Sequence, residues 1–191
     1  MRAVRRAPVK DGPLRLGFVG TLVWHKGLHV LIEALRLMPS ERVRLSVHGN
    51  TDVFPQYVRE LRARAEGLPV EFRGSFTHAQ LADVYEQFDV LVVPSLWPEN
   101  SPLVIHEAFM SGIPVVGSRT GGIVDLVTHG HNGLLYEGPD PGSLAMELRR
   151  LIANRGLLTH LAANVPPVKP IEQDAAEWEA IYGELLQCRQ S

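Results

Sequence analysis

The sequence predicts an α/β fold in which about six parallel strands form a doubly wound sheet with helices on both faces. Short apolar runs alternate along the chain with segments whose apolar residues recur at helical spacing. Strands and helices that alternate through short connections form parallel sheets by right-handed crossovers. The most continuous apolar run, Val90 to Val93, has the composition of a strand covered on both faces. We therefore place this run at the centre of the sheet.

Three strand–helix units are predicted in the first half of the chain. The first helix carries leucine and isoleucine at helical spacing, and Pro39 ends it because proline cannot continue the hydrogen-bond ladder. Thr77 and Gln80 have the spacing of a capping box, which opens a later helix. The predicted elements are, in order, strand 14–20, helix 27–38, strand 43–49, helix 55–66, strand 70–74 and a helix through 81–85.

The second half continues this alternation. Ser101 is predicted as the N-cap of a helix whose first residue is Pro102, and Gly112 closes that helix. Asp140 and Pro141 open a further helix. The predicted elements are strand 88–94, helix 101–111, strand 114–117, a turn at Gly121 and Gly122, helix 123–127, strand 134–136 and helix 140–154.

These elements define a Rossmann-like α/β domain with two flanking segments. Residues 1–13 are predicted to be an N-terminal arm or interdomain linker, residues 14–164 the Rossmann-like domain, and residues 165–191 a proline-rich break followed by a tail helix. The arm contains Arg2, Arg5, Arg6 and Lys10. We favour a solvated segment over the alternative, a peripheral membrane contact.

Composition excludes several classes of protein. The 191 residues are 45% hydrophobic and 21% charged, as expected for one globular domain. Nineteen basic and 21 acidic residues give a net charge of −2, which argues against nucleic acid as a partner. The single cysteine, Cys188, excludes a disulfide framework and favours a cytoplasmic location. No apolar run approaches the roughly 20 residues of a spanning helix.

The ligand is expected beyond the carboxyl ends of the strands, because loops and helix N-termini converge there in open α/β sheets. Four of the five loops at this edge contain glycine, which lets the backbone approach a ligand closely. The fifth loop carries a polar cluster instead. The five loops are 20–27, 49–52, 74–77, 94–101 and 118–122.

Lys26 lies in the first of these loops, at the start of a helix. Its ammonium and the helix amide groups could together bind a phosphate. Taken alone, such a lysine is more often an exposed residue of a first turn. The loop has neither the Gly-x-Gly-x-x-Gly pattern nor the lysine position of a P-loop, so a nicotinamide enzyme and a P-loop enzyme are disfavoured.

Two glutamates, Glu99 and Glu107, lie eight positions apart in and after the polar loop. Glu99 can point into the crevice. Glu107 has apolar neighbours in a helix, where a carboxylate needs hydrogen-bonding partners, and the two hydroxyls of a ribose would satisfy it. The amide groups of Ser101, Leu103 and Val104 are then placed to hold a pyrophosphate. The alternatives are a surface acid on a loop and a solvated helix face.

This segment resembles the retaining GT-B glycosyltransferases of family 4, whose C-terminal domain carries two glutamates separated by seven residues. The resemblance covers nearly the whole chain. It includes Gly20-Thr-Leu-Val-Trp-His-Lys26-Gly27, Phe72-Arg-Gly74, Asp89-Val-Leu-Val-Val-Pro-Ser95, Glu99 to Glu107, Gly112-Ile-Pro-Val-Val116, Gly121-Gly122 and Asn132-Gly-Leu-Leu135.

The resemblance implies roles for individual residues. Glu99 and Lys26 are the implied catalytic residues, with Glu99 at the transferred sugar and Lys26 at the pyrophosphate, while Glu107 holds the ribose. Backbone at Gly74 and Ser75 borders the base. The remaining implied substrate-binding residues are Gly20, Thr21, Asn100, Ser101, Pro102, Leu103 and Val104. Many family members have arginine where this chain has Thr21.

The implied function is therefore the donor-binding domain of an enzyme that transfers a sugar from a nucleoside diphosphate sugar with retention of configuration. No metal or cofactor is implied, and His129 and His131 are interpreted as parts of a turn. The N-terminal acceptor-binding domain of the family is missing, so the isolated chain is expected to be inactive. The exposed face of the tail helix could mediate self-association. Alternatives are a non-catalytic nucleotide-sugar-binding module and half of a sugar-nucleotide epimerase.

Overall fold

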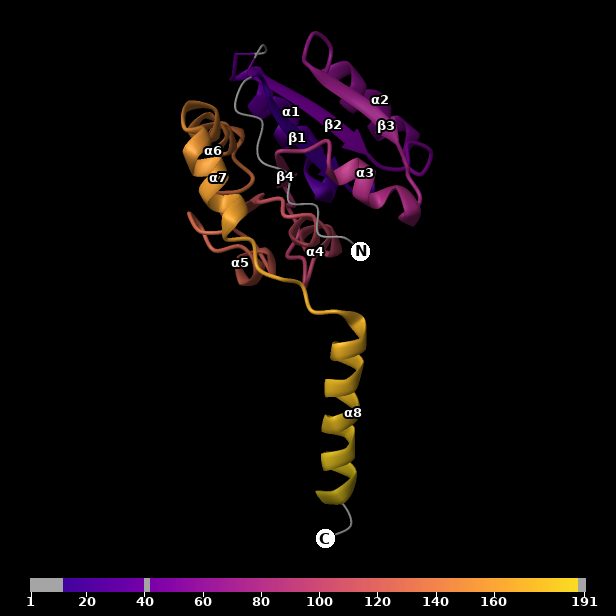
Figure 1. Ribbon diagram of the computed structural model, residues 1–191. Helices are drawn as coiled ribbons and strands as arrows, with labels where there is room; N and C mark the ends of the chain where they lie inside the picture. The colour runs from indigo at the N-terminus through magenta and orange to yellow at the C-terminus, as the bar shows by residue number, and fades with distance from the viewer. Residues whose placement is uncertain (1–11, 40–41, 189–191) are drawn as a thin grey trace.

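A computed structural model describes residues 12–39 and 42–188 of the chain (Figure 1). Most of the predicted arm, including Arg2, Arg5, Arg6 and Lys10, and the side chain of Cys188 lie outside the described residues. Six strands form one sheet in the order β3-β2-β1-β4-β5-β6. They are β1 Leu14–Val19, β2 Val43–His48, β3 Val70–Gly74, β4 Val90–Val93, β5 Val115–Ser118 and β6 Gly133–Tyr136.

All neighbouring strands pair in parallel, which confirms the predicted doubly wound sheet. The four residues of β4 are all buried, and β4 lies beside β1 at the centre of the strand order. The strand order changes direction between these two strands. The carboxyl ends of these two strands are therefore at the topological switch point, where α/β sheets bind ligands.

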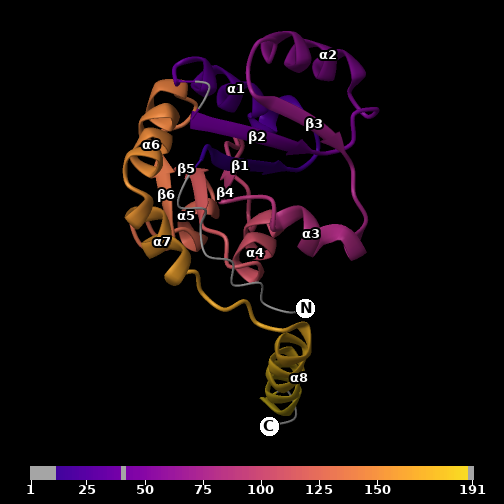
Figure 2. The ribbon, with the colours of Figure 1, turned by 45° about the horizontal axis from the view of Figure 1, so that its top comes forward.

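Helices cover both faces of the sheet (Figure 2). One apolar core lies between the sheet and α1, α2, α6 and α7, and a second lies between the sheet and α3, α4 and α5. The helices are α1 Leu28–Arg36, α2 Pro55–Arg64, α3 Leu81–Tyr85, α4 Leu103–Met110, α5 Ile123–Leu126, α6 Pro141–Ala153, α7 Arg155–Ala163 and α8 Ile171–Cys188, with single 3-10 turns η1 Trp24–Lys26 and η3 His78–Gln80.

Local sequence signals explain the starts of α6 and of the turn before α3. The carboxylate of Asp140 accepts hydrogen bonds from the backbone N–H groups of Gly142 and Ser143, at 2.8 and 3.1 Å, and Pro141 is the first residue of α6. The Gln80 side chain accepts a bond from the Thr77 N–H at 2.9 Å and opens the turn before α3. Both predicted helix starts are thereby confirmed.

Two helix predictions differ from the structure. Ser101 is not the N-cap of α4; the cap is Pro102, and the Ser101 hydroxyl lies 2.8 Å from His106 Nε2 instead. The prediction also stopped at residue 154 and missed α7. Asn154 ends α6 and begins α7 at once, because its side chain accepts a bond from the Leu157 N–H at 3.0 Å. An asparagine cap therefore joins two helices with no loop between them.

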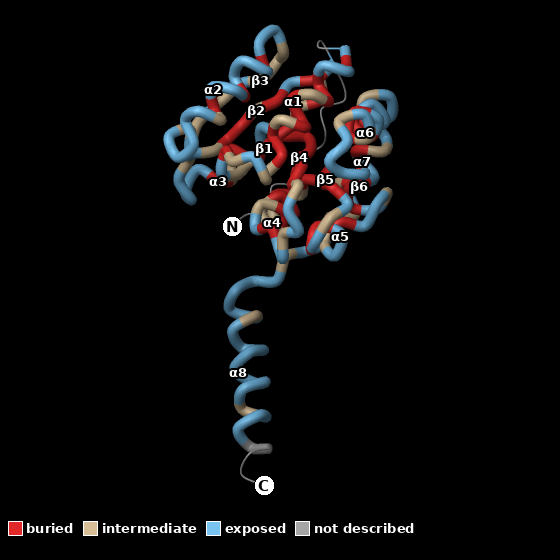
Figure 3. Tube along the Cα trace, turned by 180° about the vertical axis from the view of Figure 1, so that it is seen from behind, coloured by how far each residue is buried: buried red, intermediate tan, exposed pale blue. Residues whose placement is uncertain are grey.

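The tail helix α8 extends away from the body of the domain (Figure 1). Val165 and Val168 of the proline-rich break pack on the second apolar core, and Lys169 binds Asp174 and Glu177 of α8 at 2.9 and 2.7 Å. Most of α8 is exposed (Figure 3). None of the described helices is both long and apolar enough to cross a lipid bilayer.

Candidate functional site

Neighbouring loops at the carboxyl edge of the sheet are joined by backbone hydrogen bonds. Gly20 N–H donates to His48 O, and Gly49 N–H donates to Gly74 O, each at 3.0 Å. On the other side of β1, Leu96 N–H donates to His25 O at 2.8 Å. Each bond joins the carboxyl ends of two adjacent strands or the loops that follow them, and the loops that sequence reasoning selected therefore do come together at one edge.

Lys26 and Glu99 meet at this edge, although 73 positions separate them. The Lys26 Nζ donates to Glu99 Oε1 at 2.6 Å, and the Ser95 hydroxyl donates to the same oxygen at 2.9 Å. Burial alone would raise the pKa of Glu99, but the hydrogen bonds from Lys26 and Ser95, with the positive charge of Lys26, lower it below its ordinary value. The site therefore holds an ionised carboxylate beside an ammonium group.

The loop that carries Glu99 rests on the two glycines after β5. The Gly122 N–H donates to Glu99 O at 2.5 Å. A Cβ atom at Gly121 would lie 2.6 Å from Glu99 O, and one at Gly122 would lie 1.6 Å from Asn100 O. Only residues without a side chain allow this contact of backbone on backbone. The glycine pair thus sets the height of Glu99 above the sheet.

Glu107 lies on α4 and is oriented by a tyrosine. The hydroxyl of Tyr85, whose ring is fully buried, donates to Glu107 Oε2 at 2.6 Å. Burial and the bond to this carboxylate raise the pKa of Tyr85, so the hydroxyl remains protonated. Glu107 Oε1 has no partner among the described residues. One carboxylate oxygen is therefore left to accept bonds from a ligand.

The other predicted residues lie around these two acids. Thr21, Ser75, Asn100 and Ser101 are exposed, each in a loop at the same edge. No side chain caps α4, so its first amide groups, which lack partners within the helix, can bind an anion. The structure brings Lys26 and Glu99 into contact and leaves Glu107 apart from them, bonded to Tyr85.

Sequence reasoning missed Ser95 and Tyr85, the residues that hold the two glutamates. Ser95 lies two positions after the central strand. This position could have indicated a residue at the ligand edge of the sheet. Tyr85 carried no such signal, because 22 positions and another strand separate it from Glu107. Only the packing of α3 against α4 brings them together.

Among the described residues, no group of three or more His, Cys, Asp or Glu side chains is placed to hold a metal ion. His129 and His131 flank a turn at Gly130, as predicted, and His129 Nδ1 accepts the Leu135 N–H at 3.0 Å. The ring of His129 therefore fixes the turn before β6.

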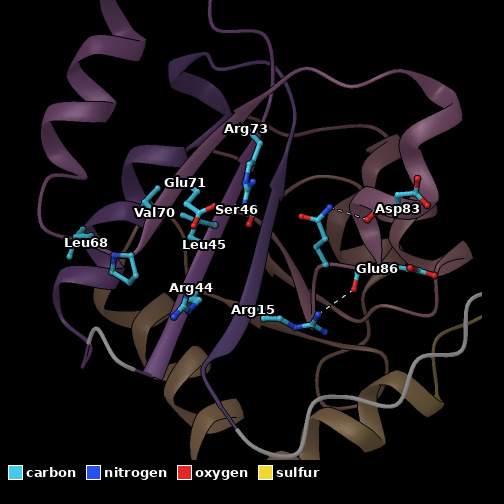
Figure 4. Close-up of a pocket in the computed structure, with 12 residues that line it drawn as sticks. Arg15, Arg44, Leu45, Ser46, Leu68, Val70, Glu71, Arg73, Asp83 and Glu86 are labelled. Carbon is cyan, nitrogen blue, oxygen red and sulfur yellow. Dashed lines mark hydrogen bonds and ion pairs between the residues drawn. The ribbon is translucent and has the colours of Figure 1, made fainter.

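A hollow of about 590 Å³ opens elsewhere, on the face of β1, β2 and β3 opposite α1 and α2 (Figure 4). Arg44 and Arg73 lie on its floor, and Asp83 and Glu86 lie at its far side. Acidic and basic side chains both line the hollow, so it favours neither an anionic nor a cationic ligand. It also lies below the strand ends, so it is separate from the candidate site.

The ion pair predicts a pH dependence of stability. The pKa of Glu99 is lower in the folded chain than its ordinary value of 4.5, so the pair stabilises the fold above about pH 4.5, and this stabilisation is lost as the pH falls through the lowered pKa. In urea unfolding, the native chain should lose more free energy of unfolding between about pH 6 and pH 3 than Glu99→Gln does. Parallel curves for the two chains would contradict the assignment.

Known proteins resemble this chain in sequence and in fold. Residues 13–154 match the family model described as Glycosyl transferases group 1. A D-inositol 3-phosphate glycosyltransferase of Xylanimonas cellulosilytica is 40% identical over 157 residues, which are 80% of this chain and 37% of that protein. The chain thus spans well under half the length of this relative.

Two solved structures have a similar backbone. HepE of Anabaena in complex with UDP-glucose superimposes with a TM-score of 0.74 at 29% identity, over 80% of this chain and 43% of that one. Sucrose-phosphate synthase from Thermosynechococcus elongatus superimposes with a TM-score of 0.81 at 27% identity, over 93% of this chain and 46% of that one.

Proposed function

Because the chain belongs to the family of glycosyl transferases group 1, we propose that it is the donor-binding domain of an enzyme that transfers a sugar from a nucleoside diphosphate sugar to an acceptor with retention of configuration. The observation that carries the proposal is the contact of Lys26 with Glu99 at the switch point of the sheet, 2.6 Å apart. UDP-glucose bound to the related HepE supports UDP as the nucleotide.

In this geometry, a different residue can contact each part of such a donor. Lys26 uses one of its three N–H groups on Glu99 and has no other side-chain partner among the described residues, so the remaining N–H groups can bind the pyrophosphate. Glu99 faces the sugar with its second oxygen, and Glu107 accepts the ribose hydroxyls with Oε1. The first amide groups of α4 and Lys26 would then stabilise the charge that develops on the leaving nucleotide.

Nucleotide binding by the 191-residue chain tests this proposal. Calorimetry with UDP, GDP and ADP should give heat of binding with UDP and at least about ten-fold weaker binding with the other two, because backbone at the end of β3 reads the base. Equal affinity for all three would contradict base recognition at Gly74 and Ser75. Absence of binding for all three would contradict the donor-binding role of this chain.

One alternative is a binding module with no activity of its own. The chain covers only 37% of the Xylanimonas protein, so a second domain would supply the acceptor site. If the isolated chain hydrolyses or transfers the donor, and Glu99→Ala abolishes this activity, the chain is an enzyme by itself. The alternative of a non-catalytic module is then wrong. Interconversion of a UDP-sugar by the longer protein would indicate the epimerase. A cytoplasmic location remains part of the proposal.

The tail helix α8 provides the surface for that second domain in our proposal. Trp178, Tyr182 and Leu185 are 52%, 60% and 59% exposed on it. Five acidic residues and no basic ones lie within 171–188, so two copies of α8 would repel each other. A second domain with a basic, apolar surface fits better than self-association.

Sedimentation of the chain over a hundred-fold range of concentration tests the partner of α8. We expect a monomer at neutral pH and low salt, because the acidic helices repel. Trp178→Glu should leave that result unchanged. A dimer that Trp178→Glu dissociates would contradict the proposal and would assign α8 to self-association instead.

A further inference from the structure

We propose that Ser95 and Ser118 are positioning residues that hold the Glu99 carboxylate so that one of its oxygens remains available to the sugar of the donor. The second part of this inference rests on the proposed function of Glu99. Neither serine belongs to the set of residues that the family resemblance implies for the site.

The two serines form a buried series of hydrogen bonds from the sheet to the carboxylate. Ser118 is fully buried, and its hydroxyl donates to the backbone oxygen of Ser95 at 2.7 Å. Ser95 is only 2% exposed, and its hydroxyl donates to Glu99 Oε1 at 2.9 Å. Polar groups buried to this extent are normally bonded, and the shortest of these bonds lead from Ser118 through Ser95 to the Glu99 carboxylate.

The strand register explains why Ser118 is needed. The ladder between β4 and β5 ends where Val93 pairs with Gly117. Strand β4 ends at Val93, so the Ser95 carbonyl lies outside the ladder. Ser118 is still held in the sheet, because it pairs with Tyr136 of β6. Its hydroxyl therefore extends the connection between the two strands by one side-chain bond.

The Ser95 hydroxyl has one proton and three acceptors within reach. The carbonyl oxygens of His25 and Trp97 lie at 3.3 Å, and Glu99 Oε1 lies at 2.9 Å. The charged and nearest acceptor takes the proton, because hydrogen bonds to ionised groups are the stronger ones.

The result is an unequal use of the two carboxylate oxygens. Lys26 and Ser95 both donate to Oε1, whereas Oε2 has no partner among the described residues. A carboxylate held by two bonds at one oxygen cannot rotate freely. Glu99 is thereby prepared to accept a sugar hydroxyl at Oε2 without giving up its contact with Lys26.

The orientation of Glu99 can be tested without any ligand. The side-chain carboxyl carbon of Glu99 is followed by NMR through a pH titration of the full chain. In Ser95→Ala the pKa of Glu99 should rise relative to the native chain, because a donor to the ionised form is lost. Ser118→Ala should raise it less, since it frees only the Ser95 backbone. Amide spectra establish that both variants are folded.

Ser111→Ala is the matched control, because Ser111 is also a buried serine and its hydroxyl donates to Glu107 O at 2.9 Å within α4. It should leave the pKa of Glu99 unchanged. If Ser95→Ala leaves the Glu99 titration identical to that of the native chain, the positioning role is wrong. If Ser111→Ala shifts it as much as Ser95→Ala does, the effect is a general loss of packing and the positioning role is also wrong.

The link to the sugar is tested by comparing UDP-glucose with UDP in calorimetry. Ser95→Ala should weaken UDP-glucose by about three- to ten-fold and leave UDP unchanged, because Glu99 faces the sugar and not the nucleotide. Equal weakening of both ligands overturns the link. If the native chain binds neither, the proposed function fails, and the titration still decides whether the serines position Glu99.

Discussion

Glu107→Gln is expected to weaken UDP binding by about a hundred-fold, the largest loss for any single side chain of the site. A carboxylate that accepts two ribose hydroxyls makes two charged hydrogen bonds, each of about 1.5–3 kcal/mol. Glutamine keeps one oxygen, which Tyr85 would occupy as it occupies Glu107 Oε2 at 2.6 Å. The amide NH2 then faces the ribose hydroxyls and cannot accept from them. Calorimetry with UDP measures the loss.

Two further variants separate the ribose contact from its support. Tyr85→Phe leaves the carboxylate in place and removes the hydroxyl that orients it, so we expect a loss of about ten-fold or less. Glu60→Gln, at an exposed position on α2, is the control for loss of one acidic charge and should bind UDP as the native chain does. Unchanged affinity in Glu107→Gln would remove Glu107 from the site.

Gly27→Ala is expected to lower the free energy of unfolding by about 3 kcal/mol or more. Gly27 lies between η1 and α1 at φ +73°, a left-handed conformation. A Cβ atom there would lie 1.8 Å from Pro94 O, so two backbone segments would have to separate. The strain of the conformation and the overpacking add up. Urea unfolding measures the difference.

Gly67→Ala is the matched control for this substitution. Gly67 has almost the same angle, φ +75°, but a Cβ atom there meets nothing within 4 Å. It should cost only about 1 kcal/mol, from the conformation alone. Equal losses at the two positions would mean that the contact of Gly27 with Pro94 does not limit the fold. Gly27→Ala should also weaken UDP binding, because it separates the loops that carry Lys26 and Glu99.

The order of strands and helices could be predicted because each element carries a local signal. The apolar pattern, together with flanking proline and glycine residues, indicated where all six strands lie. Asp140 and Pro141 indicated the start of α6. The start of α4 was misread because a serine before proline has the composition of an N-cap, while the Ser101 hydroxyl is near His106 instead. Local spacing does not show which of several possible partners a side chain will contact.

The candidate residues could be placed together at one edge of the sheet for a topological reason, since the carboxyl ends of all strands of a parallel sheet meet there. The contacts within the candidate site could not be predicted in this way. Lys26 was assigned to a phosphate and Glu99 to a sugar, yet their direct bond joins residues 73 positions apart. The pairing of Tyr85 with Glu107 depends in the same way on how two helices pack. Such pairings need the crossover geometry, which no single segment determines.

The position of β3 at the border of the sheet has a consequence for the behaviour of the chain in concentrated solution. An open strand edge can add a strand from another molecule and begin aggregation. Here the open strand is only five residues long, Pro69 precedes it, and its outward residues Glu71 and Arg73 form an ion pair with each other. Short length, proline and charge all discourage the addition of a further strand. The residues of β3, at the border of the sheet, thus discourage the addition of strands from other molecules.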